Sequence, residues 1–305
     1  MPPAGASAGL MIPRAQMRWR LTVQTLAAAL LVACGTSMPD RAQGHAADVG
    51  ARAPFGQTGT WALVFHDEFE GAELDGTRWH TCHWWDDHGC TIKTNNELQW
   101  YRPENVVLRD GHLVLRATER GYRAPDGKDF AYTSGMVSTG QNAYRSPIPH
   151  LFADTFFYAE IRARIPTGRG LWPALWLLPA ANTHPPEIDI MEVVGQAPRD
   201  LNMTVHFLDE AGQRRKLQNH WRSRAPLDDW HIYAVDWQPG RIIWFVDGQP
   251  LATVTAPARA IPKEPMYFVA NLAVGGDMPG PPGRSTVFPA EFEIDFVRIW
   301  KRGGS

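Results

Sequence analysis

The sequence shows no excess of charge of either sign and no apolar run long enough to span a membrane. Its 305 residues carry 30 Lys and Arg against 32 Asp and Glu, a net charge of −2. Such a balance favours neither nucleic acid nor an acidic membrane surface as a partner. The chain also lacks an internal repeat, a second composition regime and, from Trp61 onward, a convincing helical period. We therefore expect one domain over residues 57–302, built from strands.

The sustained apolar run nearest the N-terminus covers only residues 21–33. It follows Arg18 and Arg20, is too short to cross a membrane and has the proportions of a secretory signal. The run ends in Leu-Val-Ala-Cys-Gly, which resembles the lipobox of bacterial lipoproteins, with Cys34 as the lipidated residue. An ordinary signal peptide with a cysteine at its cleavage region is the alternative.

These features predict three parts of the chain. Residues 1–34 form a lipoprotein signal, for which Met11 and Met17 are alternative starts. Residues 35–56 are small and polar without periodicity, as a tether would be, and the domain follows. The expected product is an exported, monomeric lipoprotein of the cell envelope that contacts the membrane only through its lipid anchor.

Cysteine is scarce, with three residues in all. If Cys34 carries lipid, Cys82 and Cys90 remain on either side of the loop HWWDDHG, in an oxidising compartment where a disulfide is expected. The alternative is a zinc site that recruits three nearby histidines, His80, His83 and His88. Because this loop does not offer ordered ligand spacing, we predict a disulfide and no metal.

Tryptophan, proline and glycine are plentiful, with 13, 25 and 27 residues. A chain rich in turns suits an all-β scaffold, and its tryptophans either line a sugar-binding cleft or fill a large core. Residues 157–165 alternate apolar with polar side chains, so this strand is expected to have one buried and one exposed face. Asp110-Gly111 and Asp247-Gly248 separate neighbouring strand-like runs, as hairpin turns do. The pattern predicts a two-sheet antiparallel sandwich.

Three acids lie within six residues of one apolar run, residues 187–195 (EIDIMEVVG). On a regular strand Glu187 and Asp189 share a face, whereas Glu192 has the opposite parity. A β-bulge with Met191 as the extra residue would return Glu192 to that face, and bulges are common beside active sites. We therefore expect the three carboxyls to line one cleft.

Two neighbouring carboxyls supply what the hydrolysis of a glycosidic bond requires. One must be ionised to attack the anomeric carbon, and the other must hold a proton for the leaving oxygen. Like charges placed close together raise one of the two pKa values. The alternatives are an edge strand with solvated acids, which seldom interleaves them with Ile, Met and Val, and a calcium site, which prefers ligands from a loop.

The acid segment resembles the E-x-D-x-x-E signature of glycoside hydrolase family 16. Further segments resemble the laminarinase-like members in the same order along the chain: residues 95–101, 170–179, 204–206, 233–237 and 271–276. The resemblance implies that the sandwich is a jelly roll with a concave substrate cleft. It further implies a retaining endo-glycosidase that needs no cofactor. It also implies a polysaccharide substrate, with internal β-1,3 or mixed β-1,3/1,4 linkages of a glucan as the expected bonds.

The same resemblance implies residue roles. Glu187 takes the role of nucleophile, Asp189 assists it, and Glu192 is the acid/base. Five further residues are implied to line the cleft: Asn95, Trp172, Trp176, His206 and Asn271. From residue chemistry alone, the tryptophans stack on sugars or pack in the core, the histidine binds a catalytic carboxylate or is simply buried, and Asn95 binds hydroxyls or makes a turn.

Two departures from the family pattern leave the substrate open. Met278 stands where laminarinase-like members often carry a tryptophan after the paired glycines, and the loop with Trp84 and Trp85 is an addition. The alternatives are transglycosylation, galactan hydrolysis, a non-catalytic lectin and a structural envelope protein. The three acids argue against the lectin, and a structural protein would have no cleft and release no oligosaccharides. Structural calcium is also left open, with Glu68 and Asp295 as candidate ligands.

Overall fold

Strands account for nearly all the regular structure, as the sequence predicts. The computed structural model describes residues 52–82, 90–141 and 149–303. The helices in these ranges are three short 3-10 turns, Lys93–Asn95, Pro103–Asn105 and Ala258–Ala260. No described helix has the length and hydrophobicity that a membrane crossing requires. Cys34, the expected signal and most of the expected tether lie outside the described residues.

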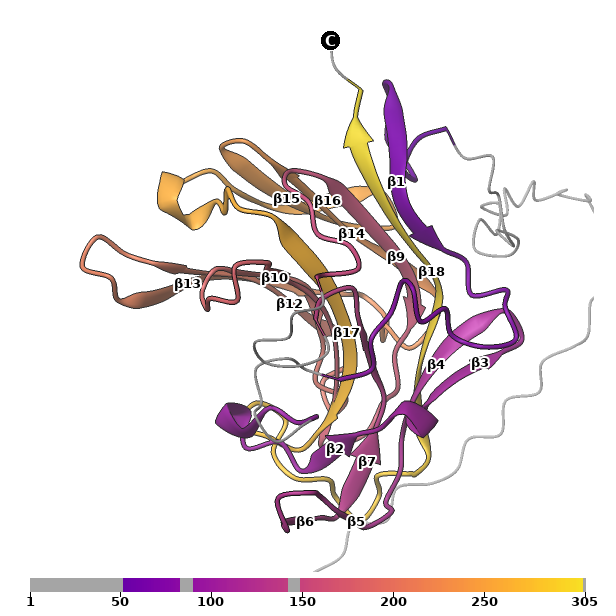
Figure 1. The fold of residues 1–305 in the computed structure, drawn as a ribbon. Coiled ribbons are helices and arrows are strands. Elements are labelled where there is room, and N and C mark those ends of the chain that lie inside the picture. Colours follow the sequence, from indigo (N-terminus) through magenta and orange to yellow (C-terminus); the bar gives the residue numbers. More distant parts are fainter. Residues whose placement is uncertain (1–51, 83–89, 142–148, 304–305) are drawn as a thin grey trace, which may run out of the picture. The chain divides into compact units, whose positions relative to one another are not determined.

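Two antiparallel sheets form the body of the described unit (Figure 1). The eight-stranded sheet has the order β16-β15-β14-β9-β18-β4-β3, and β1 also pairs with β18. Its strands are β1 Trp61–Asp67, β3 Val106–Arg109, β4 His112–Ala117, β9 Tyr158–Arg164, β14 His231–Gln238, β15 Arg241–Val246, β16 Gln249–Val254 and β18 Ala290–Arg302.

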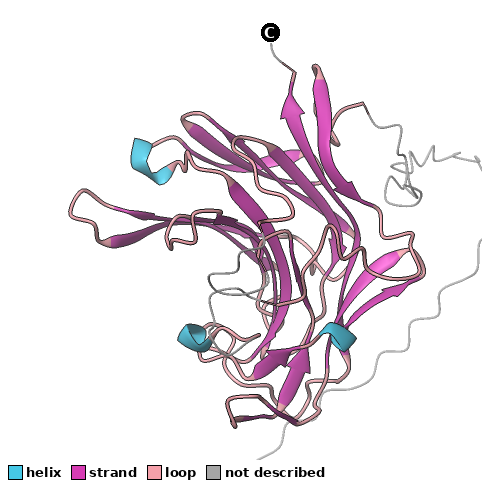
Figure 2. Cartoon of the chain, viewed as in Figure 1, coloured by secondary structure: helices cyan, strands magenta, loops and turns pink. Residues whose placement is uncertain are grey.

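The six-stranded sheet has the order β13-β12-β11-β10-β17-β8. Its strands are β8 Met136–Ser138, β10 Leu171–Pro179, β11 Glu187–Glu192, β12 Asp200–Leu208, β13 Arg214–Arg222 and β17 Met266–Val274. Two small pairs complete the fold, β2 Gln99–Tyr101 with β7 Tyr132–Ser134 in parallel and β5 Tyr122–Arg123 with β6 Asp129–Phe130. Figure 2 shows how strands make up both layers while the helical turns sit at their margins.

Apolar side chains of the two sheets form one large core. Every residue of β17 is buried, and in β10 every residue except Trp172. Trp237 and Trp244 are fully buried, so part of the abundant tryptophan fills the core. The indole Nε1 of Trp244 donates a hydrogen bond of 2.8 Å to the backbone carbonyl of Asp189. This bond joins the eight-stranded sheet to the strand that carries the three acids.

The alternation predicted for residues 157–165 is only partly present. Ala159, Ile161 and Ala163 face the core, but Tyr158 and Glu160, expected to be exposed, are each only 1% exposed. Glu160 accepts hydrogen bonds from Trp300 Nε1 at 2.9 Å and from the Phe55 backbone at 2.8 Å. The prediction was wrong here because the segment before β1 covers the outer face of this sheet.

The two aspartate–glycine turns are present as predicted. Asp110 and Gly111, with φ of 55° and 74°, join β3 to β4. Asp247 and Gly248, with φ of 50° and 74°, join β15 to β16. Both residues of each turn lie in the left-handed region that a two-residue hairpin requires, and glycine adopts it without strain.

Cys82 and Cys90 form the predicted disulfide, with 4.9 Å between their α-carbons. Because their sulfurs are bonded to each other, neither thiol is available as a zinc ligand. His83, Trp84, Trp85 and His88 lie outside the described residues.

The candidate calcium ligands both face arginines. Glu68 accepts hydrogen bonds of 2.9 and 2.7 Å from Arg298. Asp295 accepts one of 2.6 Å from Arg162. A calcium ion would have to displace guanidinium groups that already neutralise these carboxylates, so this pair does not favour calcium.

Candidate active site

Strand β11 carries the acids in the interior of the six-stranded sheet, between β10 and β12. From Asp189 to Glu192 it advances three residues while its partner β12 advances two, which is the predicted β-bulge. Against β10 the residue without a partner is Ile190, one position before the predicted Met191. Met191 keeps its ladder partner and is fully buried. The bulge brings the three carboxyls into one cleft.

Two histidines contact the first two acids. His206 of β12 pairs with Glu187 in register, and its Nε2 lies 3.2 Å from Asp189 Oδ2 and 3.5 Å from Glu187 Oε1. The contact between His206 and a carboxylate of the cleft is therefore present as predicted. His184 Nε2 lies 2.6 Å from Glu187 Oε2. Sequence reasoning missed His184, although its position three residues before Glu187 was a usable signal.

Burial and the histidines act in opposite directions on the first two acids. Burial raises the pKa of Glu187, but the hydrogen bond from His184 and the charges of His206 and His184 bring that pKa below its ordinary value. Burial and the charge of Glu187 raise the pKa of Asp189 to about 7. Burial lowers the pKa of His206, yet Asp189 and Glu187 raise it above its usual value. Glu187 is thus the acid held in its ionised form.

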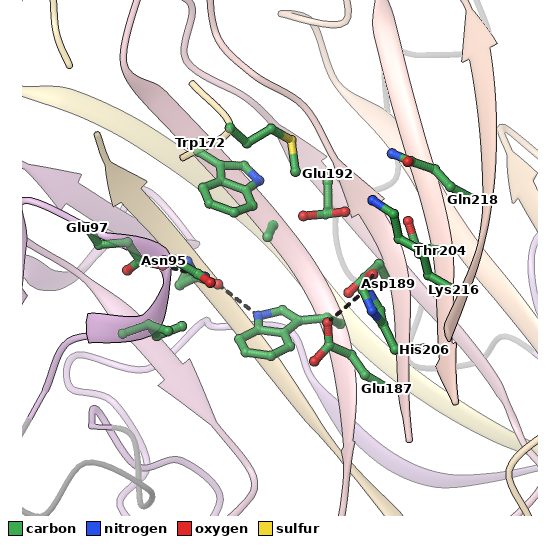
Figure 3. Close-up of a pocket in the computed structure, with 15 residues that line it drawn as sticks. Asn95, Glu97, Trp172, Glu187, Asp189, Glu192, Thr204, His206, Lys216 and Gln218 are labelled. Carbon is green, nitrogen blue, oxygen red and sulfur yellow. Dashed lines mark hydrogen bonds and ion pairs between the residues drawn. The ribbon is translucent and has the colours of Figure 1, made fainter. Parts of the chain in front are cut away.

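Glu192, the last residue of β11, is held in the opposite state. It is only 8% exposed. Burial, followed by the charges of Asp189 and Glu187, raises the pKa of Glu192 well above its ordinary value, and Trp172 and Lys216 only partly offset this. Among the residues that the structure describes, the buried indole N–H of Trp172 has no partner in hydrogen-bonding geometry, and Figure 3 shows it facing Glu192. One strand therefore presents an ionised and a protonated glutamate to the same cleft.

Trp172 and Trp176 lie on one face of β10, as predicted, and both line the cleft. Trp176 is 8% exposed, and its Nε1 donates a 2.8 Å hydrogen bond to Asn271 Oδ1. Asn271 Nδ2 in turn donates to the Tyr101 hydroxyl at 2.9 Å. Both polar atoms of the Asn271 side chain are therefore engaged, so it holds Trp176 in place.

Glu97 is a fourth buried acid of the cleft, and sequence reasoning did not select it. Asn95 Nδ2 donates to its Oε1 at 3.1 Å, and Gln99 Nε2 donates to its Oε2 at 2.6 Å. The Tyr101 hydroxyl lies 3.3 Å from the same Oε2, which joins Glu97 to Asn271. Burial raises the pKa of Glu97 to about 7 against these hydrogen bonds.

All eight predicted catalytic and cleft residues come together in the structure. The lining contains Asn95, Trp172, Trp176, Glu187, Asp189, Glu192, His206 and Asn271, as Figure 3 shows for those it labels. Residues that were not predicted complete it: Glu97, Thr204, Lys216 and Gln218. Met278 also lines the cleft, at the place where the family pattern often has an aromatic ring. An adjoining hollow shares Glu187 and His206 and adds Asn182, His184 and Arg214.

Glu187, Asp189 and His206 also present ligand atoms within 4.8 Å of one another, a spacing that a metal ion would accept. His206 contacts both carboxylates directly, and these contacts already explain why the three side chains lie close together. A cation bound there would coordinate the carboxylate of Glu187, the acid that is held ionised.

A β-sandwich with an ionised and a protonated carboxyl on one bulged strand, next to indole rings, has the parts of a glycosidase. The comparison with known families agrees. The chain belongs to glycosyl hydrolases family 16, whose model matches residues 94–297.

Individual proteins are similar over most of the domain. The chain is 35% identical over 253 residues to the endo-1,3-1,4-beta-glycanase EglC of Rhizobium meliloti, covering 78% of this chain and 51% of that relative. It is 34% identical over 272 residues to a beta-glucanase of Rhodothermus marinus, covering 79% and 85%. The catalytic domain of an endo-1,3-beta-glucanase (laminarinase) from Thermotoga petrophila matches with a TM-score of 0.68 at 28% identity, covering 81% of this chain and 100% of that one. The chain thus spans about half the length of EglC.

Proposed function

We propose that this protein hydrolyses internal β-1,3 or mixed β-1,3/1,4 linkages of a glucan with net retention of configuration. The observation that carries the proposal is the geometry of β11, whose bulge brings Glu187, in contact with two histidines, and the buried Glu192 into one cleft. Glu187 has a pKa below its ordinary value and Glu192 a pKa well above it. The similar proteins are named as glucan-cleaving enzymes, which supports a glucan as the substrate.

In the proposed first step, a carboxylate oxygen of Glu187 attacks the anomeric carbon. The bond to the leaving sugar oxygen breaks while Glu192 gives that oxygen its proton, and a glycosyl ester of Glu187 forms. Esterification removes the charge of Glu187, one of the charges that raise the pKa of Glu192. Glu192 then takes a proton from water, whose oxygen attacks the same carbon and releases Glu187 as a carboxylate.

Asp189 and the two histidines act on Glu187. A protonated Asp189 donates a hydrogen bond to Glu187, which lowers the pKa of the nucleophile, although burial and the histidines have larger effects on it. His184 and His206 hold the carboxylate by its two oxygens. We assign these three residues the task of orienting Glu187 and keeping it ionised.

Sugar binding is assigned to the walls of the cleft. Trp172 is only half-buried and offers a ring face for stacking on a sugar. Trp176 lines the cleft at the level of Asp189, its partner in register. Asn95 and the buried Glu97 provide polar atoms of the lining, whereas Asn271 acts through Trp176. Met278 replaces the usual aromatic ring with a flexible apolar side chain, which would weaken stacking at that position.

The mechanism uses side chains and water, so the proposal includes no cofactor. A structural calcium ion at Glu68 and Asp295 has little support because both carboxylates are paired with arginines. EDTA should therefore leave the rate unchanged. A fall in rate that added calcium restores would show that an ion is needed.

The deciding experiment separates the two glutamates by rescue with azide. Glu187→Ala should be inactive on laminarin, and azide should restore turnover with an activated β-glucoside and yield the α-glycosyl azide. Glu192→Ala should instead give the β-glycosyl azide, because the nucleophile is intact and azide attacks the glycosyl ester. Product analysis of the unmodified protein on laminarin, lichenan and agarose identifies the linkage. Exchange of the two azide anomers, or no cleavage of any glucan, would refute the assignment.

We also propose that the protein is an exported, monomeric lipoprotein anchored through Cys34. The support is the apolar run at residues 21–33 followed by Ala33, Cys34 and Gly35. Cys34→Ser should move the protein from the membrane fraction to the soluble fraction of the producing cell. Mass spectrometry of the mature N-terminus should find a diacylglyceryl cysteine at residue 34. Light scattering of the detergent-solubilised protein measures its molar mass and so tests whether it is a monomer.

A further inference from the structure

Strand β13 forms one edge of the six-stranded sheet and is rich in cations. Leu217 and Trp221 turn inward and pack against the core, so the even-numbered residues face the cleft side of the sheet. The register agrees, since Lys216 pairs with His206, a cleft residue. The even-numbered positions on this strand are Arg214, Lys216, Gln218, His220 and Arg222.

These cations differ in whether an acid neutralises them. Arg222 donates to both oxygens of Asp200, at 2.7 and 2.8 Å, and His220 lies 3.4 Å from the same carboxylate. Lys216 has no hydrogen-bond or ion-pair partner among the residues that the structure describes. Within the described ranges Arg214 donates only to the backbone carbonyl of His184, at 3.2 Å, and both Lys216 and Arg214 are exposed.

The two cations without an acidic partner lie beside the proposed site of cleavage. Lys216 lines the hollow that holds all three acids, and Arg214 lines the adjoining hollow with His184. Arg214 and Lys216 are two residues apart on β13, so their α-carbons are separated by roughly 7 Å. Figure 3 shows Lys216 and Gln218 on the far side of the acids from Trp172. A glycan lying in the cleft therefore has an indole on one side and positive charge on the other.

Neutralising the acids does not require these cations. Glu187 already has His184 and His206 as partners, and Asp189 has His206. Glu192 is held in its neutral form, although Lys216 is near. The positive charge of Lys216 and Arg214 is therefore left for a ligand.

We propose that the cleft accepts a β-glucan that carries anionic substituents, and that Lys216 and Arg214 bind the oxyanion of such a group next to the cleaved bond. Carboxylate and sulfate share the required chemistry, a charged oxygen that a lysine or arginine binds by a charge-assisted hydrogen bond. This inference rests on the proposed glucan hydrolysis and adds a substrate class to it.

The test compares kcat/KM for laminarin and for carboxymethylated laminarin of low substitution. The unmodified protein should prefer the anionic polymer by about five-fold at low ionic strength, as expected for a solvent-exposed ion pair. In the double variant Lys216→Gln/Arg214→Gln the ratio should fall to about one. Any effect of Lys216 on the protonation of Glu192 changes both substrates equally and cancels in the ratio.

Arg215→Gln is the matched control, because Arg215 lies between the two residues, points to the other face and pairs with Asp209 at 2.7 Å. Its ratio should equal that of the unmodified protein. Salt of about 1 M, with a Debye length of about 3 Å, should also reduce the preference. Sulfated laminarin as a third substrate shows whether the site favours sulfate over carboxylate.

The outcomes separate this inference from the function on which it rests. No cleavage of laminarin by the unmodified protein would refute the proposed hydrolysis itself. Cleavage of laminarin with the same substrate ratio in the unmodified protein and the double variant would refute only the anionic substrate. A lower ratio in the double variant, but not in Arg215→Gln, would support it.

Discussion

Both sheets hold carboxyl groups that are shielded from water, yet they surround them differently. On and beside the eight-stranded sheet three acids meet arginines, in the pairs Glu68–Arg298, Asp295–Arg162 and Glu291–Arg109. On the six-stranded sheet Glu187 and Asp189 meet histidines. Within the described ranges, no arginine forms an ion pair with any of the three acids of β11.

Whether an acid is paired with arginine or with histidine decides whether its carboxyl group can change protonation state near neutral pH. Arginine stays protonated at every accessible pH, so a carboxylate beside it stays ionised. The hydrogen bond from Arg109 accordingly lowers the pKa of Glu291, whereas burial among other acids raises that of Glu192. Histidine changes charge near neutral pH. The acids paired with arginine therefore serve the structure of the fold, whereas the acids of β11 remain able to exchange protons.

The largest expected difference between the sheets concerns kcat. Glu187→Gln should lower kcat on laminarin by at least about 10⁴-fold, because the amide cannot attack the anomeric carbon. Glu291→Gln, its counterpart on the other sheet, should leave kcat unchanged. Steady-state kinetics of both variants measures this. Similar kcat values would show that Glu187 is no more important for catalysis than Glu291.

The free energy of unfolding should depend more on the acids that are paired with arginine than on the acids of β11. Arg298→Met leaves Glu68 charged and mostly buried without its partner, which should lower the free energy of unfolding by about 3 kcal/mol or more. Urea denaturation monitored by tryptophan fluorescence measures it, and kcat below the transition should not change. The double variant Arg298→Met/Glu68→Leu should recover most of the loss. A double variant as unstable as the single one would contradict a role for this ion pair.

A smaller effect should appear in the pH profile. His206→Asn removes a positive charge that lowers the pKa of Glu187. The acid limb of kcat/KM, which reports ionisation of the nucleophile in the free protein, should then move to higher pH. His184→Asn should shift it in the same direction. An acid limb that stays in place would show that the histidines do not set the charge of Glu187.

The smallest effect concerns Glu97. Its pKa is about 7 in the folded protein and near 4.5 when unfolded, so the folded state binds the extra proton between these values. The contribution of Glu97 to stability should therefore fall as pH rises from about 5 to about 8. In Glu97→Gln this decline should shrink, with the melting temperature relative to the unmodified protein higher at pH 8 than at pH 5. Parallel melting curves for the two proteins would contradict the raised pKa.

Local patterns made much of the fold and site predictable. Aspartate–glycine turns, alternation of apolar residues and the parity of Glu187, Asp189 and Glu192 each depend on a few adjacent residues. For the same reason the bulge was predicted to within one residue. The ordered family motifs also selected eight residues, and the structure places all eight in the lining of the cleft.

Only the tertiary structure decided which partners those residues meet. Glu97 contacts Asn271 through Tyr101, which is 170 positions away from Asn271 in the sequence. Glu160 is buried by a segment outside its sheet. In the part of the chain that the structure describes, Arg222 pairs with Asp200 whereas Lys216 pairs with no acid. The sequence by itself determined the strands and the three acids, because strand parity and turn chemistry are local. Register and approach between distant strands decided which partners raise or lower the pKa of each acid, and which cations of β13 pair with an acid among the described residues.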